Sequence, residues 1–249
     1  MDDAALTRDV FLGGRLAIWQ PRRGYRAATD PVLLAAAVEA RAGQSVLELG
    51  CGAGVALLAL GCRIPGLSLT GVERQADYAD LARRNVAENG IPARIVTADL
   101  TALPSDLRRG FDHVLTNPPY YPPSSPGARD PGRAAALREE TSLDQWLDEA
   151  LKRVKSGGYL TLIHMAERLG PILTALEGRA GSVAVRPIAP REGRAAGRIL
   201  VQARKDARGP LRLLAPLVMH DGPVRRGDGD DFTLGARGVL RDALPLAWD

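Results

Sequence analysis

The sequence predicts an α/β fold in which a mostly parallel β-sheet is wound with helices on both faces. Short apolar runs typical of strands alternate with longer stretches of helical apolar spacing, most of which end in glycine. Such alternation of strand and helix is the pattern of a parallel sheet. Strands are expected at 45–50, 67–73, 93–99, 111–117 and 158–164, with helices between them at 54–64, 75–90 and 142–158.

Both ends of the chain add to this core. Asp30 as N-cap and Pro31 in the first turn predict a helix over 29–40. The runs 181–190 and 197–205 predict an antiparallel hairpin at the sheet edge, which brings the expected sheet to seven strands. We therefore expect a single domain over residues 41–249, with residues 1–40 as an N-terminal extension that packs on its core.

Composition places the chain among ordinary globular proteins. It has 249 residues, of which 45% are hydrophobic and 25% charged. Its two cysteines, Cys51 and Cys62, have no His or Cys at metal-ligand spacing, so neither a metal nor a disulfide is expected. The first residues lack a signal-peptide core and no apolar run reaches membrane-spanning length, so we expect a cytoplasmic protein without a membrane partner.

The net charge of +4 is unevenly distributed. Residues 171–249 hold 13 Lys and Arg against 9 Asp and Glu, which accounts for the whole excess. A second basic cluster, at 15–26, has Trp19 and Tyr25 between its arginines. Arginine with aromatic residues suits nucleic acid, through phosphate contacts and stacking on bases. An arginine-rich solvated surface explains the charge equally well.

A glycine-rich turn follows the first core strand, in "VLELGCGAGVALLAL" (46–60). Such a turn lets a cofactor approach the main chain at the sheet's carboxyl edge. Glu73 ends the next strand, where a carboxylate can bind the two hydroxyls of a ribose, and Asp99 ends the third, within reach of an adenine ring. The register Glu-x-Gly-x-Gly-x-Gly differs from the Gly-x-Gly-x-x-Gly of dinucleotide oxidoreductases, which would show a similar turn.

A second motif, "TNPPY" (116–120), directly follows an apolar run. Proline lacks the N–H that a strand ladder needs, so the chain leaves the sheet at Asn117. A residue before a proline is also held extended, which makes Asn117 and Pro118 a stiff platform at a strand end. The Pro-, Ser- and Gly-rich segment 121–141 that follows is predicted to be a lid.

In this order, the glycine turn, Glu73, Asp99 and the Asn-Pro-Pro-Tyr motif closely resemble the class I S-adenosylmethionine-dependent methyltransferases, whose fold is Rossmann-like. The resemblance implies S-adenosylmethionine as cofactor, S-adenosylhomocysteine as product, and no metal. The cofactor contacts that it implies are Glu48, Gly50, Gly52, Gly54, Glu73, Asp99, Leu100 and Asn117.

In that family the Asn-Pro-Pro-Tyr motif marks methylation of a nitrogen conjugated to a planar group: adenine N6, guanine N2 or a glutamine amide. Such a nitrogen is a poor nucleophile because its lone pair is delocalised. The Asn117 side-chain oxygen and the Pro118 carbonyl can accept its two hydrogens and direct the lone pair, while Tyr120 stacks on the ring. These three are the expected catalytic residues. Because stacking needs only the ring, Tyr120→Phe is expected to be mild.

Segments 20–38 and 198–222 and the "TNPPYYPP" loop are similar to bacterial adenine-N6 methyltransferases that modify valine tRNA next to its anticodon. This similarity implies that Arg26, Thr29 and Asp30 lie over the methionine end of the cofactor. The expected function is N6-methylation of adenine in tRNA or another structured RNA. Methylation of rRNA guanine N2 or protein glutamine remains open, as does a non-catalytic module. Some of the basic residues should flank the cleft and contact phosphates: Arg15, Arg22, Arg23, Arg26, Arg191, Arg194, Arg198, Arg204 and Lys205.

Overall fold

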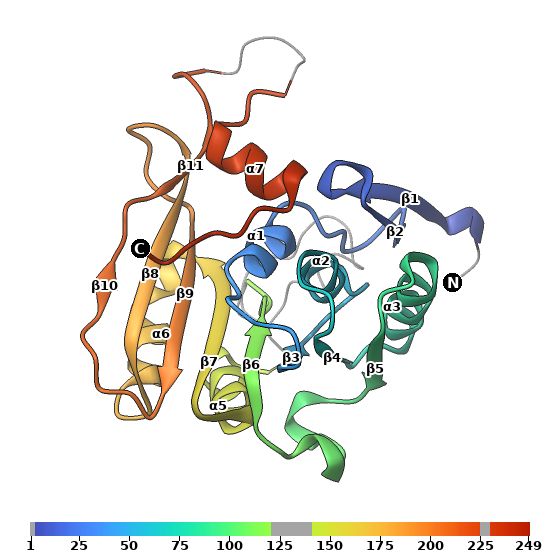
Figure 1. Ribbon diagram of the computed structural model, residues 1–249, viewed down its shortest axis with the longest axis horizontal. Helices are drawn as coiled ribbons and strands as arrows, with labels where there is room; N and C mark the ends of the chain where they lie inside the picture. The colour runs from blue at the N-terminus through green and yellow to red at the C-terminus, as the bar shows by residue number, and fades with distance from the viewer. Residues whose placement is uncertain (1–2, 121–140, 225–229) are drawn as a thin grey trace.

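The computed structural model describes residues 3–120, 141–224 and 230–249. Its centre is a nine-stranded sheet in the order β10-β8-β9-β7-β6-β3-β4-β5, with β11 also paired with β8 (Figure 1). The strands are β3 (Ser45–Leu49), β4 (Ser68–Glu73), β5 (Ala93–Thr97), β6 (Phe111–Thr116), β7 (Val154–Met165), β8 (Ala180–Arg191), β9 (Arg198–Lys205), β10 (Arg212–Leu213) and β11 (Leu217–His220).

The Rossmann-like class I methyltransferase fold predicted from the sequence is confirmed. Strands β3 to β7 are mutually parallel, whereas β9 runs antiparallel to both β7 and β8. All seven predicted strands are present, including the antiparallel β8–β9 hairpin, although this hairpin does not form the edge of the sheet as predicted. Two short strands that the sequence did not reveal, β10 and β11, run parallel to β8 and extend the sheet.

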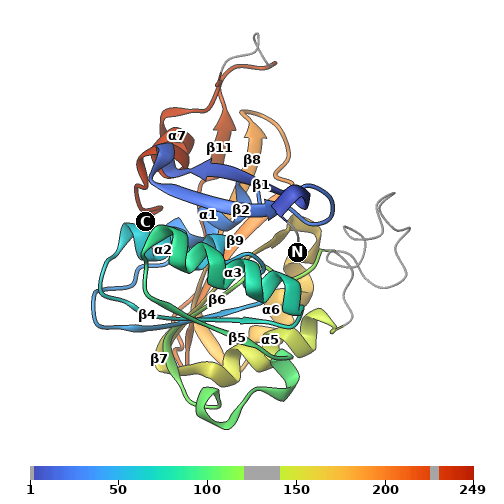
Figure 2. The same cartoon turned by 90° about the vertical axis from the view of Figure 1, so that its right-hand side faces the viewer.

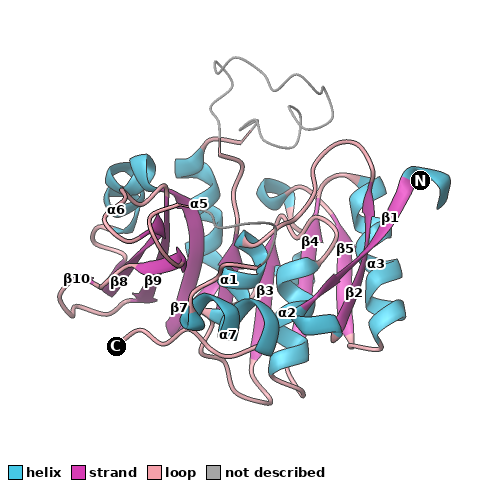
Figure 3. Cartoon of the chain, turned by 90° about the horizontal axis from the view of Figure 1, so that it is seen from above, coloured by secondary structure: helices cyan, strands magenta, loops and turns pink. Residues whose placement is uncertain are grey.

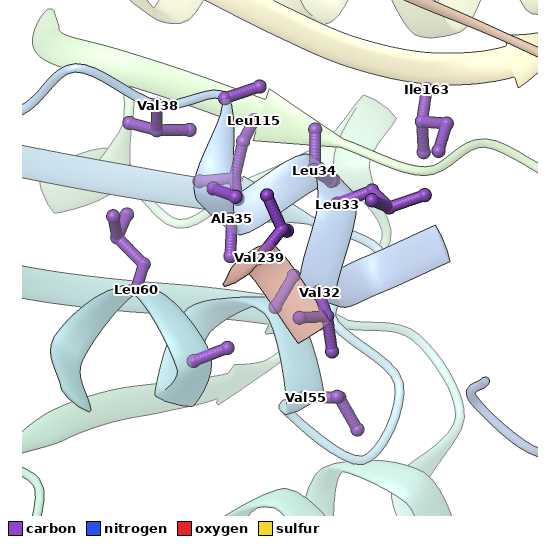
Figure 4. Close-up of a cluster of buried hydrophobic side chains, with 14 of the residues drawn as sticks. Val32, Leu33, Leu34, Ala35, Val38, Val55, Leu60, Leu115, Ile163 and Val239 are labelled. Atoms are coloured by element: carbon purple, nitrogen blue, oxygen red, sulfur yellow. The ribbon is translucent and has the colours of Figure 1, made fainter. Parts of the chain in front are cut away.

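Helices cover both faces of the sheet (Figures 2 and 3). One layer consists of α1 (Asp30–Ala36), α2 (Val55–Arg63), α3 (Ala76–Asn89) and α7 (Leu234–Asp242), and the other of α5 (Leu143–Arg153) and α6 (Leu169–Leu176). Consecutive strand residues face opposite layers. Leu115 belongs to the core under α1 and α2 (Figure 4), and its neighbour Val114 to the core under α5. Buried on both faces, the central strands are nearly continuous apolar runs.

Residues 6–21 form a hairpin that the sequence did not predict. Strands β1 (Leu6–Phe11) and β2 (Leu16–Pro21) pair antiparallel as a separate two-stranded sheet. Two asparagines of α3 hold the free edge of β2: Asn85 Oδ1 accepts the Trp19 N–H at 2.8 Å, and Asn89 Oδ1 accepts the Ala17 N–H at 2.9 Å. Their amide nitrogens donate to the carbonyls of the same two strand residues. Asn85 and Asn89, one helical turn apart on α3, are thus spaced to bind Trp19 and Ala17, which are two residues apart on β2 and point their backbone groups to the same side.

Two helix predictions need correction. The helix predicted over 142–158 ends at Arg153, because Val154 pairs with Phe111 and begins β7. The glycine at 158 belongs to this strand, where a Cβ would lie 2.7 Å from the Asp112 carbonyl oxygen. Because Gly158 has no side chain, β7 can approach β6 closely at this point. The glycine therefore does not mark the end of a helix.

The N-cap predicted at Asp30 is also wrong. Thr29 is the N-cap residue, its side chain makes no capping hydrogen bond, and α1 ends at Ala36 instead of residue 40. The Asp30 carboxylate is bound elsewhere, as described below. The lid predicted at 121–141 lies outside the described residues apart from Thr141. In the part of the chain that the structure describes, no helix combines the length and apolar character required to cross a membrane.

Candidate active site

A cleft lies at the carboxyl edge of the sheet, where β3, β4, β5 and β6 end, and its cavity volume is about 290 Å³. The chain proceeds from β3 through β4 to β5 and then returns to β6 on the other side of β3. In open α/β sheets, a crevice at such a switch point is the usual ligand site.

The glycine turn after β3 forms one wall of this cleft. Gly50 and Gly52 have φ of +71° and +52°, the left-handed region that glycine adopts without strain. A Cβ on Gly50 would lie 2.8 Å from the Trp146 ring, and one on Gly52 would lie 3.9 Å from the Tyr25 ring. The turn thus presents bare backbone to the cleft between two aromatic side chains, which suits a close-fitting cofactor.

Glu73, the last residue of β4, is fixed by the glycine turn. Its Oε2 accepts the Gly52 N–H at 2.9 Å and its Oε1 accepts the Gln75 N–H at 2.8 Å. A carboxylate oxygen has two lone pairs, so each oxygen can accept a further hydrogen. The carboxylate thus keeps acceptor sites that could take the paired hydroxyls of a ribose.

Asp99 follows β5 and also lines the cleft. Its Oδ1 accepts hydrogen bonds from the hydroxyl and the N–H of Thr101, at 2.7 and 2.8 Å. These two bonds hold the pKa of the Asp99 carboxyl below its usual range. Leu100 is buried beside it and contributes an apolar surface to the same part of the cleft.

Glu48 lies deeper, behind the glycine turn. Its side chain is buried, and Oε2 accepts the Leu57 N–H of α2 at 2.9 Å. Burial raises the pKa of Glu48 well above its usual range, the Leu57 bond opposes this shift, and the charge of Glu73 adds to it. Glu48 therefore links the end of β3 to the start of α2 as well as bordering the cleft.

Asn117 is the first residue after β6. Its side-chain oxygen, Oδ1, is buried and has no hydrogen-bond partner among the residues that the structure describes. The neighbouring Thr116 is firmly held, because its hydroxyl donates to the Leu49 carbonyl at 2.9 Å and accepts the Trp146 indole N–H at 2.7 Å. A buried acceptor without a donor is costly, so this oxygen is suited to a ligand that brings one.

Tyr120, at the end of the motif, is bound through both its hydroxyl and its ring. The hydroxyl donates to Asp30 Oδ2 at 2.7 Å, and Arg198 Nε donates to the same oxygen at 2.6 Å. The ring edge meets His164 with centroids 5.3 Å apart. Burial and the charge of Asp30 raise the pKa of Tyr120, so its hydroxyl remains protonated.

The segment after β2 closes the opposite wall. Gln20, buried, accepts the Ala27 N–H at 2.7 Å and donates to Asp9 at 2.9 Å. Arg26 forms an ion pair with the same aspartate. The Tyr78 hydroxyl of α3 donates to the Tyr25 carbonyl at 3.0 Å. These contacts hold Tyr25 over the glycine turn.

The structure brings most of the predicted site residues to one cleft. Glu48, Gly50, Gly52, Glu73, Asp99, Leu100, Asn117, Pro118, Tyr120, Arg26 and Asp30 all line it. Gly54 and Thr29 are not among its lining residues. A Cβ on Gly54 would meet Ala82 of α3 at 3.4 Å, so this glycine serves the packing of α2 on α3.

Two of the basic residues expected near the cleft lie elsewhere. Because β9 is antiparallel, it begins at the cleft with Arg198 and ends at the opposite edge of the sheet. There the Arg204 Nε donates to the Gly157 carbonyl, and the Lys205 ammonium donates to the Leu151 and Val154 carbonyls. Arg204 and Lys205 are therefore not among the basic residues that flank the cleft.

Sequence reasoning missed the aromatic walls, Tyr25, Tyr78 and Trp146, as lining residues. In the sequence, Tyr25 stands between arginines and Trp146 lies within a stretch of helical apolar spacing, so neither pattern points to a cleft. A signal for Trp146 existed in the glycine at position 50, since a residue without a side chain at a strand end leaves room for a large neighbour.

The fold and the cleft define the class of protein: an S-adenosylmethionine-dependent methyltransferase with the class I fold. A family model described as "Methyltransferase small domain" matches residues 28–185. The chain therefore belongs to the methyltransferase small domain family.

Two relatives are similar over much of the chain. The tRNA1(Val) (adenine(37)-N6)-methyltransferase of Porphyromonas gingivalis is 36% identical over 171 residues, which cover 65% of this chain and 67% of that protein. The protein of the same name from Dickeya chrysanthemi is 26% identical over 244 residues, which cover 96% and 95%. A solved structure from Agrobacterium tumefaciens, described as a predicted O-methyltransferase, has a TM-score of 0.71 at 27% identity and covers 87% of this chain and 98% of that one.

Proposed function

We propose that the protein transfers a methyl group from S-adenosylmethionine to the N6 nitrogen of an adenine in RNA, with tRNA as the substrate. The observation that carries this proposal is the buried Asn117 side-chain oxygen, which lacks a donor among the described residues. An exocyclic amine would supply the missing hydrogen. Because the proposed substrate is RNA, we place the protein in the cytoplasm.

The cleft residues divide into roles for the methyl donor. Glu73 would bind the ribose hydroxyls with its two fixed oxygens, and Asp99 and Leu100 would flank the adenine ring. The bare backbone at Gly50 and Gly52 would leave space for the methionine part. When bound, S-adenosylmethionine supplies an electrophilic methyl group on a sulfonium.

Residues of the Asn-Pro-Pro-Tyr motif would orient and activate the target amine. The Asn117 side-chain oxygen and the Pro118 carbonyl would each accept one hydrogen of the target amine. These bonds draw electron density onto the nitrogen and hold its lone pair toward the methyl donor. The nitrogen would form the new N–C bond with this lone pair as the methyl–sulfur bond breaks and its electron pair passes to sulfur, which leaves S-adenosylhomocysteine. One hydrogen of the nitrogen would then leave as a proton to solvent. No histidine is required, and burial lowers the pKa of His164, which adjoins Tyr120, to about 4.

Relatives support adenine in tRNA over the other planar nitrogens. The proteins named tRNA1(Val) (adenine(37)-N6)-methyltransferase include one that aligns with 96% of this chain. A release factor glutamine methyltransferase from Chlorobaculum tepidum, 38% identical, aligns with only 36% of it. An adenine in an unpaired loop also costs least to turn out into a cleft of this kind.

Methylation of unmodified tRNA in vitro tests the proposal. The purified protein would be incubated with transcribed tRNA and S-adenosylmethionine, and the digested nucleosides analysed by mass spectrometry. We expect N6-methyladenosine with the wild type and its formation about 100-fold or more slower with Asn117→Ala. N2-methylguanosine would instead support the guanine alternative. Methylation of a glutamine-containing protein, without any RNA product, would overturn the RNA assignment.

A further inference from the structure

One carboxylate joins three segments of the chain that are far apart in sequence. Asp30 Oδ2, at the start of α1, accepts the Tyr120 hydroxyl at 2.7 Å and Arg198 Nε at 2.6 Å. Tyr120 lies four residues after β6, and Arg198 begins β9. The side chain of Asp30 is only 15% exposed, whereas that of Arg198 is 43% exposed.

Helix capping does not explain this carboxylate. Asp30 is the first residue of α1, where its charge suits the helix N-terminus, but the N-cap residue is Thr29 and its side chain makes no capping hydrogen bond. The largely buried Asp30 carboxylate is instead hydrogen-bonded to Tyr120 and ion-paired with Arg198. A largely buried charge is tolerated there because it is paired and hydrogen-bonded, so Asp30 and its two partners hold one another in place beside the cleft.

The ring of Tyr120 is held from a second direction as well. It meets His164 edge-on, with an interplanar angle of 63°, and the Arg198 guanidinium carbon lies 5.7 Å from its centroid. His164 is fully buried and its Nδ1 accepts the Met165 N–H at 2.9 Å, so this contact is itself fixed. The hydroxyl and the ring edge together set the orientation of the ring.

We propose that Asp30 is a positioning residue that, with Arg198, fixes the Tyr120 ring as the wall against which the target base stacks. The inference rests on the proposed function, which places a planar base beside Tyr120. A base stacks on a fixed face in one plane, and this plane determines whether its amine reaches the Asn117 oxygen. Loss of a fixed orientation weakens productive binding even when the stacking surface remains.

This inference changes one expectation from the sequence. If stacking alone mattered, Tyr120→Phe would be mild. Because the hydroxyl is the link to Asp30, the phenylalanine variant should behave as a positioning variant with a measurable defect in RNA use.

Steady-state methylation of transcribed tRNA by Tyr120→Phe, Asp30→Ala and the double variant tests the proposal. For each single variant we expect the KM for tRNA to rise about 10-fold, the scale of a lost hydrogen bond to a carboxylate. The double variant should be no worse than the more affected single variant, since both remove one link. Binding of S-adenosylmethionine to Tyr120→Phe, which keeps Asp30, should change less than about twofold when measured by calorimetry.

Two further variants sharpen the test. Asp30→Asn keeps an acceptor oxygen for the Tyr120 hydroxyl, so its KM should lie between those of the wild type and Asp30→Ala. Tyr159→Phe removes a hydroxyl from the residue of β7 that pairs with His113, and it should leave the KM for tRNA unchanged. A Tyr120→Phe enzyme with wild-type KM, or single effects that multiply in the double variant, would overturn the inference. If the wild type forms no N6-methyladenosine, the proposed function itself fails.

Discussion

Asn117 shows how one atom can indicate a reaction. Its Oδ1 is buried without a partner among the described residues, while its neighbour Thr116 is hydrogen-bonded on both sides. The strand end is therefore rigid except for one unused acceptor. Such an acceptor stabilises the transition state if the N–H groups of the amine become stronger hydrogen-bond donors as the methyl group transfers.

Asn117→Ala should accordingly lower kcat for RNA methylation by about 100-fold or more while leaving affinity for S-adenosylmethionine within about twofold. Single-turnover methylation and calorimetry on the same preparation measure the two quantities. A variant that retains wild-type turnover would remove Asn117 from the mechanism.

Glu73 is a second residue whose contacts support a specific prediction. Glu73→Ala removes the acceptor for two backbone N–H groups as well as the proposed ribose contacts. We expect affinity for S-adenosylmethionine to fall by about 1–2 kcal/mol, measured by calorimetry. Nicotinamide dinucleotides should bind negligibly to either form. Tight binding of such a dinucleotide, with no binding of S-adenosylmethionine, would contradict the assignment of this cleft.

At the scale of elements, the glycine turn and α5 depend on each other. The Gly50→Ala side chain would clash with Trp146 at 2.8 Å and occupy a φ of +71°. We expect it to weaken S-adenosylmethionine binding by 10-fold or more and to lower the free energy of unfolding by about 1–3 kcal/mol.

Gly43→Ala is the matched control for that variant. Gly43 has φ +86° but nothing within 4 Å of a Cβ, so its replacement carries the backbone cost without a clash. It should leave cofactor affinity unchanged. Equal losses of affinity in both variants would show that Trp146 has no part in the effect.

The sequence revealed the parallel core because its strands are buried on both faces and read as apolar runs. It missed the β1–β2 hairpin because one face of β1 is exposed and carries Arg8 and Val10, which leaves a weak pattern. The docking of β2 also depends on Asn85 and Asn89, which look like ordinary polar positions of a helix. Tertiary partners of this kind are not encoded in local periodicity. The same holds for the site, where strand-end residues were predictable but the aromatic walls and the Asp30 bonds were not.

Two buried histidines give the whole molecule a predictable response to acid. Burial lowers the pKa of both His113 and His164 to about 4, against 6.5 in an unfolded chain. The unfolded state therefore binds more protons between these values, and the folded state loses stability as pH falls from 6.5 toward 4. Each histidine can contribute about 2–3 kcal/mol to this loss.

Urea unfolding at pH 7 and pH 5 measures the effect. The two histidines should lower the free energy of unfolding at pH 5, and the raised pKa of Glu48 opposes them. The test is therefore the part of the difference between the two conditions that disappears in His113→Gln. A difference that is unchanged in this variant would show that His113 does not titrate as its burial implies.

Basic residues near the cleft should give RNA binding a steep dependence on salt. Arg22 and Arg23 follow the N-terminal hairpin, and Arg194 lies exposed in the turn between β8 and β9. Replacing the three with glutamine should lower the slope of log affinity for tRNA against log salt by about one per lost phosphate contact. Gel-shift titrations at several salt concentrations measure this slope.

Two exposed arginines near the opposite edge, Arg208 and Arg212, provide a control for total charge. Replacing both should leave the slope nearly unchanged. If the two sets of variants lower the slope equally, tRNA binding depends on the total charge of the protein and not on a defined basic surface.

The nucleosides of bulk tRNA from cells test the central claim most directly. Mass spectrometry would compare cells that carry the intact gene, cells that lack it, and cells that carry Asn117→Ala at the same protein level. We predict that N6-methyladenosine at one tRNA position is present in the first and absent from the other two. Unchanged N6-methyladenosine in all three would contradict the proposed activity, and its loss only on deletion would contradict the role of Asn117.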